Sequence, residues 1–568
     1  MNIKDRNNVI FIFSLLLGLT FLLWKANYGY IYNDEPFLLG LGYRLVNGDA
    51  MIANEWSVMS IVSFLIYPFM YIYNLFNPTT EGIAMFGRYC FIFIWTVAIV
   101  FSYTRLKKYG VFATVGCLIF YLFAPLDMMT LSYNSFALSS LLITSTLLVT
   151  AKNRIDLILI GVFFSFAVLS LPFLVVIYFL FSLFVLITLF IKKDIKLNKN
   201  FDVKEGWFYI TLGAGSILII FLIFIFSRIS LNTFINQIKY FEYANSDHPM
   251  PTLYNFIMSY INGVLLRFKY FTFASLILSI VILIDKKRQK HSLLYLSIVL
   301  IIILIQFYYL LQVANIYPRM NLYIVPFTLI GIVSFLLAKK KNFYIFIYFI
   351  VSSFINSIII NLTSNLGIMA ISSMFVISSF GSMLLLKDLY DEIKDEQLDI
   401  IKPLNIIIIC FILLQFSNQL FYRYNYYYMD KEIEELKYKV NRGPGKGTII
   451  HDERIKNHYN VYDQVKELTY DIKNNDNFVY LEHEPWLFLI NNTKWSTYST
   501  WGYWTDGNPD IVKTLEINMM FYKEHPEKFP TYILLKKQNK NLVTDFITLL
   551  ESKNYNIRES EDFILYYK

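Results

Sequence analysis

The chain has few of the residues that carry nucleophilic or metal-dependent chemistry. Its 568 residues include three cysteines, and Cys90, Cys117 and Cys410 all lie in apolar runs without metal-thiolate spacing. The six histidines all lie outside these runs. The sequence also lacks a defensible Ser-His-Asp order, an HExxH motif and the glycine fingerprint of dinucleotide-binding folds. These absences exclude a disulfide framework, a thiolate metal site and the best-known hydrolase and dehydrogenase signatures.

Charge is also scarce. Charged residues make up 16% of the chain and hydrophobic residues 56%, with a mean hydropathy of +0.48. Soluble proteins rarely exceed about half apolar residues, and here the excess falls in long runs. The net charge of +8 comes from Lys and Arg in short loops, which set membrane topology, so it does not indicate nucleic-acid binding.

Apolar runs of about 17–25 residues are long enough to cross a bilayer, and charged loops separate thirteen of them. We therefore predict a polytopic α-helical membrane protein with about 13 transmembrane helices. The first run follows Lys4 and Arg6, as in a signal peptide, but no small-residue cleavage site follows it, so we interpret it as an uncleaved helix. Around Pro172, residues 155–191 are either two short spans or one bent unit. The expected spans are 8–25, 83–104, 111–126, 135–150, 155–170, 173–191, 207–226, 264–284, 293–313, 319–338, 342–360, 367–386 and 404–422.

The distribution of positive charge sets the orientation. With the N-terminus inside, the inside segments hold 22 Lys and Arg, against 8 in the outer loops and outer helix ends that precede the last span. This bias places the N-terminus in the cytoplasm, and thirteen spans then place the C-terminus outside. Segment 57–77 is long enough to span, but a crossing there would reverse every later loop. We therefore expect 36–47 and 57–77 to be interfacial helices within a long first outer loop, 26–82.

The composition changes at about residue 425. Residues 1–424 are predicted to form the transmembrane domain. Residues 425–568 hold 19 Lys and Arg against 22 Asp and Glu and contain no spanning run, which predicts a small extracytoplasmic α/β domain. Segment 441–447 reads as a loop, and the Trp-rich segment 495–504 would either stack on sugar rings or pack in a core. Strands are predicted at 477–482, 531–536 and 563–567, and helices at 458–473 and 541–553.

The remaining candidates for chemistry are acids, cations and amides, and this topology places all of them on the outer face. Asp34 and Glu35 follow the first span and precede Pro36. An acidic pair beside a span is costly near lipid and often marks a site, although a wet interfacial loop would also accommodate it. The other candidates are Asp127, Tyr133, Asn134, Arg228, Lys239, His248, Arg267, Lys269 and Arg319.

Such a set suits one kind of chemistry. A carboxylate can act as general base on an acceptor hydroxyl or amine. Arginine and lysine can hold and stabilise a leaving phosphate. Because no nucleotide is available outside the cell, an activated sugar there would have to be carried on a lipid, and the site would lie at the level of the lipid headgroups.

The order of these features resembles the GT-C-type glycosyltransferases, in the branch of the protein O-mannosyltransferases and the lipid A aminoarabinose transferase. The shared order is a first helix, an acidic pair (here NDEP), interfacial helices with a GYRLVNG-like segment, many further helices and an outward α/β tail. In residues the resemblance is strongest over 30–80, moderate at 110–136, and present again in YPRMNLYIVP at 317–326.

The resemblance implies roles for several residues. Asp34 would be the catalytic base and Glu35 a supporting or metal-binding acid, although a dipole-stabilised acid at a helix start explains Glu35 as well. Where relatives carry a second acid, this chain has Asn134, which cannot act as a base or a strong metal ligand. A divalent metal, Mg or Mn, is the one cofactor left open. Donor-phosphate contacts are assigned to Arg319, Lys239, Arg228 and Arg267, and acceptor or sugar contacts to Asn134, Tyr133 and His248.

The expected protein is thus a glycosyltransferase of the bacterial plasma membrane. It would move a hexosyl or pentosyl group from a polyprenyl-phosphate donor to a glycan, lipid or protein acceptor on the outer face. One alternative is a flippase or transporter of lipid-linked glycans, which would bury charges at mid-membrane. Others are a polysaccharide polymerase or ligase relying on arginines in outer loops, and a non-catalytic scaffold. The expected partners are membrane lipids, and nucleic acid is not among them.

Overall fold

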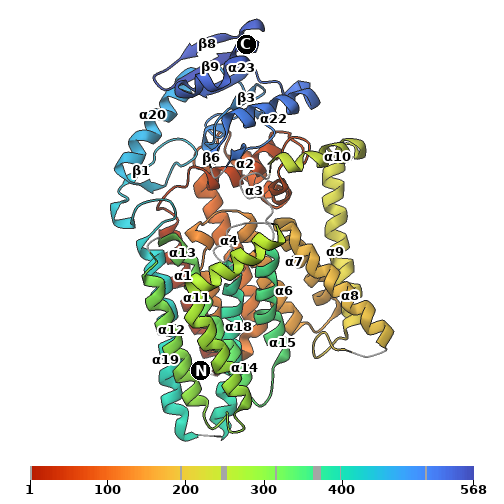
Figure 1. Ribbon diagram of the computed structural model, residues 1–568, viewed down its shortest axis with the longest axis vertical. Helices are drawn as coiled ribbons and strands as arrows, with labels where there is room; N and C mark the ends of the chain where they lie inside the picture. The colour runs from red at the N-terminus through yellow and green to blue at the C-terminus, as the bar shows by residue number, and fades with distance from the viewer. Residues whose placement is uncertain are drawn as a thin grey trace.

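The computed structural model describes residues 3–191, 195–244, 252–313, 316–361, 372–396, 398–505 and 508–568. A helical bundle forms one end of the molecule, and a C-terminal mixed sheet forms the other (Figure 1). The N-terminus lies towards the end of the bundle that is remote from the sheet, whereas the chain ends beside the sheet. The protein is therefore a polytopic helical membrane protein with a small C-terminal α/β region, as the sequence predicts.

A helix lies in each apolar run that was expected to cross the membrane. Long runs of Ile, Leu, Phe and Val satisfy their backbone hydrogen bonds internally only as helices, which is the requirement that lipid imposes. The bundle consists of α1 (Ile3–Lys25), α4 (Ile83–Leu106), α5 (Val111–Tyr121), α6 (Tyr133–Thr150), α7 (Arg154–Ser170), α8 (Val175–Ile191), α9 (Val203–Phe226), α11 (Leu253–Ile284), α12 (Ser292–Leu311), α13 (Ile316–Leu322), α14 (Thr328–Leu337), α15 (Phe343–Ile345), a π-helical turn (Phe346–Val351), α16 (Ser352–Asn361), α18 (Phe375–Glu396) and α19 (Ile401–Asn425).

Eleven helices in the described residues are long and apolar enough to cross a membrane, against the thirteen spans expected. Ten of the eleven coincide with expected spans. The three missing ones differ for local reasons: α5 has 11 residues, α7 has 17, and α18 ends in a charged segment. The region around Pro172 forms two helices, α7 and α8, joined by a 3-10 turn at Pro172–Leu174. Part of the expected span 367–386 lies outside the described residues.

The eleventh apolar helix is the segment expected at the membrane surface. A 3-10 turn (Val58–Val62) leads into α3 (Ser63–Phe76), which packs along α2 (Asp34–Val46). Both lie at the end of the bundle that faces the sheet (Figure 1). The two helices meet at Gly42, where a Cβ atom would stand 2.6 Å from the Ile66 side chain. The approach leaves no room for a larger residue, so α2 and α3 form one layer.

The C-terminal region is built on a five-stranded sheet in the order β4-β3-β7-β9-β8. Strands β4, β3 and β7 run parallel to one another, and β9 and β8 continue the sheet antiparallel. The three predicted strands are confirmed as β3, β7 and β9, and the two predicted helices as α20 and α23. The elements are β3 (Asn477–Tyr480), β4 (Lys494–Trp495), β7 (Tyr532–Lys536), β8 (Asn556–Glu559), β9 (Phe563–Tyr567), α20 (Asp452–Leu468), α21 (Pro485–Phe488), α22 (Ile511–Glu524) and α23 (Thr544–Ser552).

A hairpin joins the sheet region to residues 26–82, the segment that was expected to form the first outer loop. Strands β1 (Tyr438–Lys439) and β2 (Ile449–Ile450) flank the predicted loop 441–447. The backbone N–H of Gly29 donates to the carbonyl of Ile449 (2.8 Å), and the N–H of Ile449 donates to the carbonyl of Asn27 (2.7 Å). Gly29 has a φ of +70°, and a Cβ there would enter the ring of Tyr427. The first outer loop is therefore held against the C-terminal region just before α2 begins.

Candidate functional site

The site begins where α2 begins. Asp34 is the first residue of α2, is half-buried, and lies in the helix turn where the macrodipole favours a negative charge. The helix forms here because Pro36, with its fixed φ, occupies the first turn, where its missing N–H costs nothing. The side chain of Phe37, one turn further on, contacts Trp501 with ring centroids 4.9 Å apart.

Glu35 points into the protein and is fully buried. Its two carboxylate oxygens each accept a hydrogen bond from the guanidinium of Arg88, at 2.8 Å, and one also accepts the N–H of Ile31 at 3.1 Å. Arg88 also donates to the carbonyls of Ala26, Tyr28 and Gly29. One bidentate ion pair therefore fixes the loop before α2, and with it the position of Asp34.

This geometry does not suit a divalent metal at Glu35. Both oxygens of its carboxylate are engaged by a cation, and the side chain has no exposed surface. Within the described ranges, no three His, Cys, Asp or Glu residues gather in a way that could hold a metal ion. The residues present do not fit such an ion, and no step of the chemistry is assigned to one.

A second buried ion cluster lies behind the first. Asp127 follows the 11-residue helix α5. Its carboxylate forms an ion pair with Lys25 at 2.8 Å and another with Arg423. The ring of Tyr427 separates this cluster from Arg88, with cation–ring distances of 5.4 Å to Lys25 and 5.1 Å to Arg88. Asp127 thus ties the ends of α1 and α19 together beneath the first outer loop.

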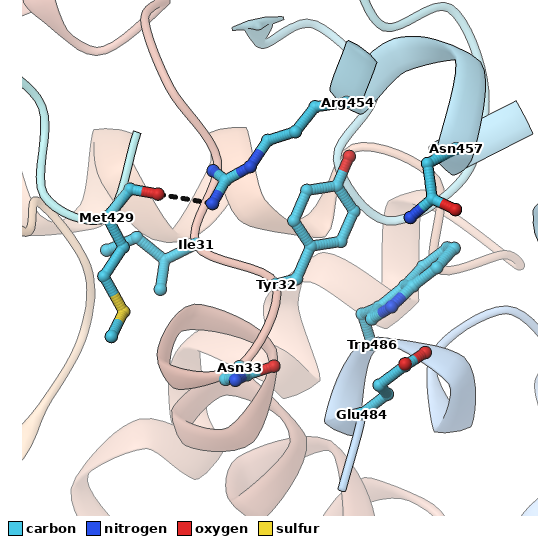
Figure 2. Close-up of a pocket in the computed structure, with 8 residues that line it drawn as sticks. All are labelled: Ile31, Tyr32, Asn33, Met429, Arg454, Asn457, Glu484 and Trp486. Carbon is cyan, nitrogen blue, oxygen red and sulfur yellow. Dashed lines mark hydrogen bonds between the residues drawn. The ribbon is translucent and has the colours of Figure 1, made fainter. Parts of the chain in front are cut away.

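A cavity of about 250 Å³ opens on the sheet side of the start of α2. The residues before α2 form one wall, and the C-terminal region forms the others (Figure 2). The ring of Tyr32 lies between Arg454 and Trp486, and Asn33 and Glu484 face the same space from below. Asn33 is the immediate neighbour of Asp34 in the chain. The lining residues are Ile31, Tyr32, Asn33, Met429, Arg454, Asn457, Glu484 and Trp486.

The two charged residues of this cavity already have partners. Arg454 pairs with Asp430 at 3.1 Å and donates to the carbonyl of Tyr30 at 3.2 Å. Glu484 accepts from Lys536 at 2.5 Å. The charged groups in the lining of the cavity are therefore balanced by ion pairs.

The wall behind Trp486 is formed by His458 of α20. The two rings stack with centroids 5.0 Å apart, and the Nε2 of His458 donates to the carbonyl of Arg442 at 3.2 Å. Burial lowers the pKa of His458 to about 4, because the charged form would lose its water. His458 is thus a neutral packing residue at physiological pH.

The Trp-rich segment 495–504 contains one tryptophan that is packed in a core and two that remain partly exposed. Trp495 is buried against Gly40 of α2, where a Cβ would stand 2.6 Å from the indole. Trp501 and Trp504 are half-buried and stack at 6.0 Å, with the imidazole of His483 against both rings. Because Trp501 contacts Phe37, this aromatic group lies close to the start of α2.

A network of buried ion pairs, called the clamp below, holds the C-terminal end of α2. It was not predicted from the sequence. Arg44 is buried and bonds to Asp49 at 2.7 Å and to Glu55 at 2.6 Å. Glu55 also accepts the backbone N–H of Thr500 at 2.9 Å, and Lys528 pairs with Asp49. Burial raises the pKa of Glu55, and Arg44 opposes that shift. The first outer loop and the C-terminal region are thus fastened together by charge-assisted bonds.

Arg228 and Lys239, two residues predicted to contact the phosphate of the sugar donor, follow α9 (Val203–Phe226) in the chain. Arg228 donates to the carbonyls of Leu45 (2.9 Å) and Asp49 (2.6 Å), and its guanidinium covers the ring of Phe224 at 4.7 Å. Lys239 is exposed at the end of α10 (Leu231–Ile238), with its ammonium 4.8 Å from the ring of Tyr240. The structure therefore gives Arg228 a bracing contact and leaves Lys239 on the surface.

Arg267 lies in a second, larger cavity of about 590 Å³ between α11 and α12. α11 departs from helical geometry at Phe268 (φ −130°), and Gln306 donates to the freed carbonyl of Arg267 at 2.7 Å. One guanidinium nitrogen of Arg267, Nη1, is buried and has no hydrogen-bond partner within the described part of the chain. Lys269 lines the same cavity, and Leu266 at its rim is 84% exposed, so the cavity opens towards the lipid-facing side of the bundle.

The remaining predicted residues are dispersed. Arg319 is half-buried in α13, and its side chain interacts with the hydroxyl of Tyr422 on α19. Tyr133 and Asn134 form the first turn of α6 and are half-buried. His248 lies outside the described residues. The structure does not join these residues to the cavity beside Asp34.

The residues that line the first cavity were missed because they come from three distant stretches of chain. Tyr32 and Asn33 lie within 30–80, where the family resemblance is strongest, but Arg454 and Glu484 lie more than 400 residues later. The local signal was the aromatic and amide content next to the acidic pair. Nothing in the spacing of the chain indicates which later residues would meet it.

Neither the known protein families nor the curated protein sequences give a match to this chain. Among solved structures, the fold is similar to that of the archaeal oligosaccharyltransferase AglB from Archaeoglobus fulgidus, determined in complex with an inhibitory peptide and a dolichol-phosphate. The match has a TM-score of 0.47 at 10% sequence identity, and covers 96% of this chain and 72% of that one.

Proposed function

We propose that the protein is an integral-membrane glycosyltransferase that takes a sugar from a polyprenyl-phosphate donor and transfers it to an acceptor on the outer face of the membrane. The observation that carries the proposal is the cavity at the start of α2, which is lined by Asn33, the residue that precedes Asp34 in the chain. A carboxylate placed on a rigid helix start next to a ligand-sized cavity is suited to general-base work.

The reaction is a single displacement. Asp34 accepts the proton of the acceptor hydroxyl, the acceptor oxygen bonds to the anomeric carbon, and the bond from that carbon to the phosphate oxygen breaks. The lipid phosphate leaves with the electron pair. Arg267 and Lys269 in the lipid-facing cavity are assigned to the donor phosphate, because a guanidinium with an unpartnered N–H stabilises an anion strongly. Arg319 remains a further candidate for the same role.

Glu35 is assigned a positioning role. Its carboxylate is bound by Arg88 and by the Ile31 N–H, so it is held away from any substrate. The ion pair instead fixes the backbone from which Asp34 projects. Asp34 is thus the only member of the acidic pair proposed to touch the acceptor.

The test compares the two neighbouring acids in membranes supplied with labelled polyprenyl-phosphate sugars. Asp34→Asn should lower the transfer rate by about 10²–10⁴-fold, the usual contribution of a general base, while the protein stays folded because Asp34 is half-buried. Glu35→Gln should instead lower the amount of folded protein, because it leaves Arg88 buried beside a neutral group. Full transfer by Asp34→Asn would remove Asp34 as the base.

The proposed setting is a bacterial plasma membrane, with a cytoplasmic N-terminus and residues 425–568 as an extracytoplasmic domain. The opposite placement of the two chain ends in the molecule supports this orientation (Figure 1). A reporter that is active only outside the cytoplasm, fused after Lys568, should be active, and the same reporter fused to the N-terminus should be silent. The reverse pattern would contradict the orientation and the outer location of the site.

A further inference from the structure

The cavity beside Asp34 (the acceptor cavity below) has a chemistry that narrows the class of acceptor. It lies on the sheet side of α2, and its walls come from the residues before α2, from residues 429–457 and from the segment around Trp486. The apolar helices of the bundle do not line it. A lipid acceptor would therefore have to reach the cavity without following the apolar helices of the bundle.

The charge of the acceptor cavity argues against an anionic ligand. Arg454 is its cation, and Asp430 already neutralises it at 3.1 Å. Glu484 is its acid and is neutralised by Lys536. Sites for phosphate or carboxylate groups usually present a guanidinium or an ammonium free to pair with the anion. The acceptor cavity offers both hydrogen-bond donors and hydrogen-bond acceptors and no unpaired charge, which suits a neutral ligand group.

Three polar groups of the acceptor cavity are available to a ligand. The Tyr32 hydroxyl is buried without a hydrogen-bond partner among the described residues. Asn33 does not cap α2 with its side chain, because its own backbone is already helical (φ −99°, ψ −66°). Asn457 is exposed on α20 at the opposite wall. A buried hydroxyl without a partner is costly in an isolated protein, so a ligand that supplies the missing bond would bind well.

We propose that the acceptor cavity is a saccharide-binding subsite, and that the acceptor is a neutral glycan. Amides on opposite walls offer hydrogen-bond donors and acceptors to the vicinal hydroxyls of a sugar ring. The volume of about 250 Å³ suits a small part of a glycan. The inference rests on the proposed function, because the proposed base, Asp34, directly follows Asn33 in the chain.

The test measures binding without transfer, so that it is independent of the proposed base. Full-length protein in lipid nanodiscs, without donor, is passed over an array of neutral oligosaccharides of glucose, galactose, mannose and N-acetylhexosamines. Separate arms carry a phosphorylated mannose oligosaccharide and a library of unmodified peptides. We expect retention on one or more neutral oligosaccharides, with no gain from the phosphate.

Matched variants locate the binding. Asn457→Ala, an exposed position whose loss should not disturb folding, is expected to weaken the retained interaction roughly tenfold, and Asn33→Ala to weaken it similarly. Asn475→Ala, an exposed asparagine outside the cavity, should bind as the unmodified protein does. Asp34→Asn should also keep its binding, so a failure of the proposed base would leave this result standing. Retention of peptides or of the phosphorylated sugar alone, retention of no saccharide, or equal binding by Asn457→Ala would overturn the proposal.

Discussion

The two cavities of this protein use arginine in opposite ways. In the acceptor cavity, Arg454 is bound to the buried carboxylate of Asp430 and to two backbone carbonyls. In the lipid-facing cavity, Arg267 has a buried N–H group without a partner in the described part of the chain, and Lys269 adds a second positive charge. The first arginine is held by the protein itself, whereas the second keeps an unpartnered N–H group, which we propose for the donor phosphate.

This difference agrees with the two substrates of a lipid-dependent transferase. A donor that carries a phosphate on a lipid needs uncompensated positive charge and access from the membrane, and the cavity of Arg267 has both. An acceptor with hydroxyl groups needs neutral donors and acceptors, and the acceptor cavity supplies those. Buried cations are costly unless paired, so the pairing state of each arginine is the observable that distinguishes the two cavities.

The largest expected effect is the loss of local stability when Arg454, the arginine paired with Asp430, is replaced. Arg454→Met removes the guanidinium from the buried carboxylate of Asp430 and leaves that carboxylate paired with His451, which should cost about 3 kcal/mol of local stability. Amide hydrogen exchange of peptides from residues 426–460, followed by mass spectrometry, should then be about a hundredfold faster. The double variant Arg454→Met with Asp430→Asn should recover much of the protection. If the exchange rate in the single variant is unchanged, Arg454 does not stabilise the fold. The contrast between a structural Arg454 and a ligand-binding Arg267 would then be wrong.

Removing the unpartnered arginine should act on lipid binding instead. Arg267→Gln should weaken the binding of polyprenyl phosphate by about tenfold or more, since a hydrogen bond to a charged group contributes about 1.5–3 kcal/mol. Native mass spectrometry of the full-length protein with polyprenyl phosphate, neutral polyprenol or inorganic phosphate separates the headgroup from the chain and from the free ion.

The control for this variant is Lys286→Gln, which removes an exposed cation from the loop at the far end of α11. It should leave binding of polyprenyl phosphate unchanged, and hydrogen exchange should be unchanged in both variants. Equal losses of the phosphate and of the neutral polyprenol from Arg267→Gln would show that the variant had damaged the groove and not the anion contact.

Much of the architecture could be predicted because it depends on local pattern. Apolar runs became helices, and the short apolar segments Tyr532–Lys536 and Phe563–Tyr567 became strands. The exact number of spans could not be predicted, because α5 and α7 are shorter than the apolar runs that contain them.

Only the part of the candidate site whose residues are adjacent in the sequence could be predicted. The acidic pair was found from its position after the first span, but the roles of its two members depend on Arg88, which lies 53 residues after Glu35. The cavity beside Asn33 depends on Arg454, and the clamp on Arg44 depends on Thr500. Contacts of this range leave no periodic signal in a single sequence, so folding alone brings these groups together.

The smallest predicted effect concerns acid pH, to which the two cavities should respond differently. His458 supports the acceptor cavity through Trp486, and its surroundings are the rings of Tyr32, Tyr459 and Tyr462 and the charges of Arg442 and Asp463. Its pKa is lowered to about 4 in the folded state. Between pH 6.5 and 4 the unfolded chain therefore binds more protons than the folded one, and stability falls as the pH falls.

At pH 5 this loss should be about 2 kcal/mol, or roughly thirtyfold lower protection of α20 against hydrogen exchange after correction for the intrinsic rate. His458→Phe keeps the stacking on Trp486 and should remove this pH dependence. The residues that line the lipid-facing cavity are amides, tyrosines, apolar residues and two cations, and they include no His, Asp or Glu from the described part of the chain. Protection of α12 should therefore stay constant over the same range, and a parallel loss in both helices would mean that the two cavities open as one unit.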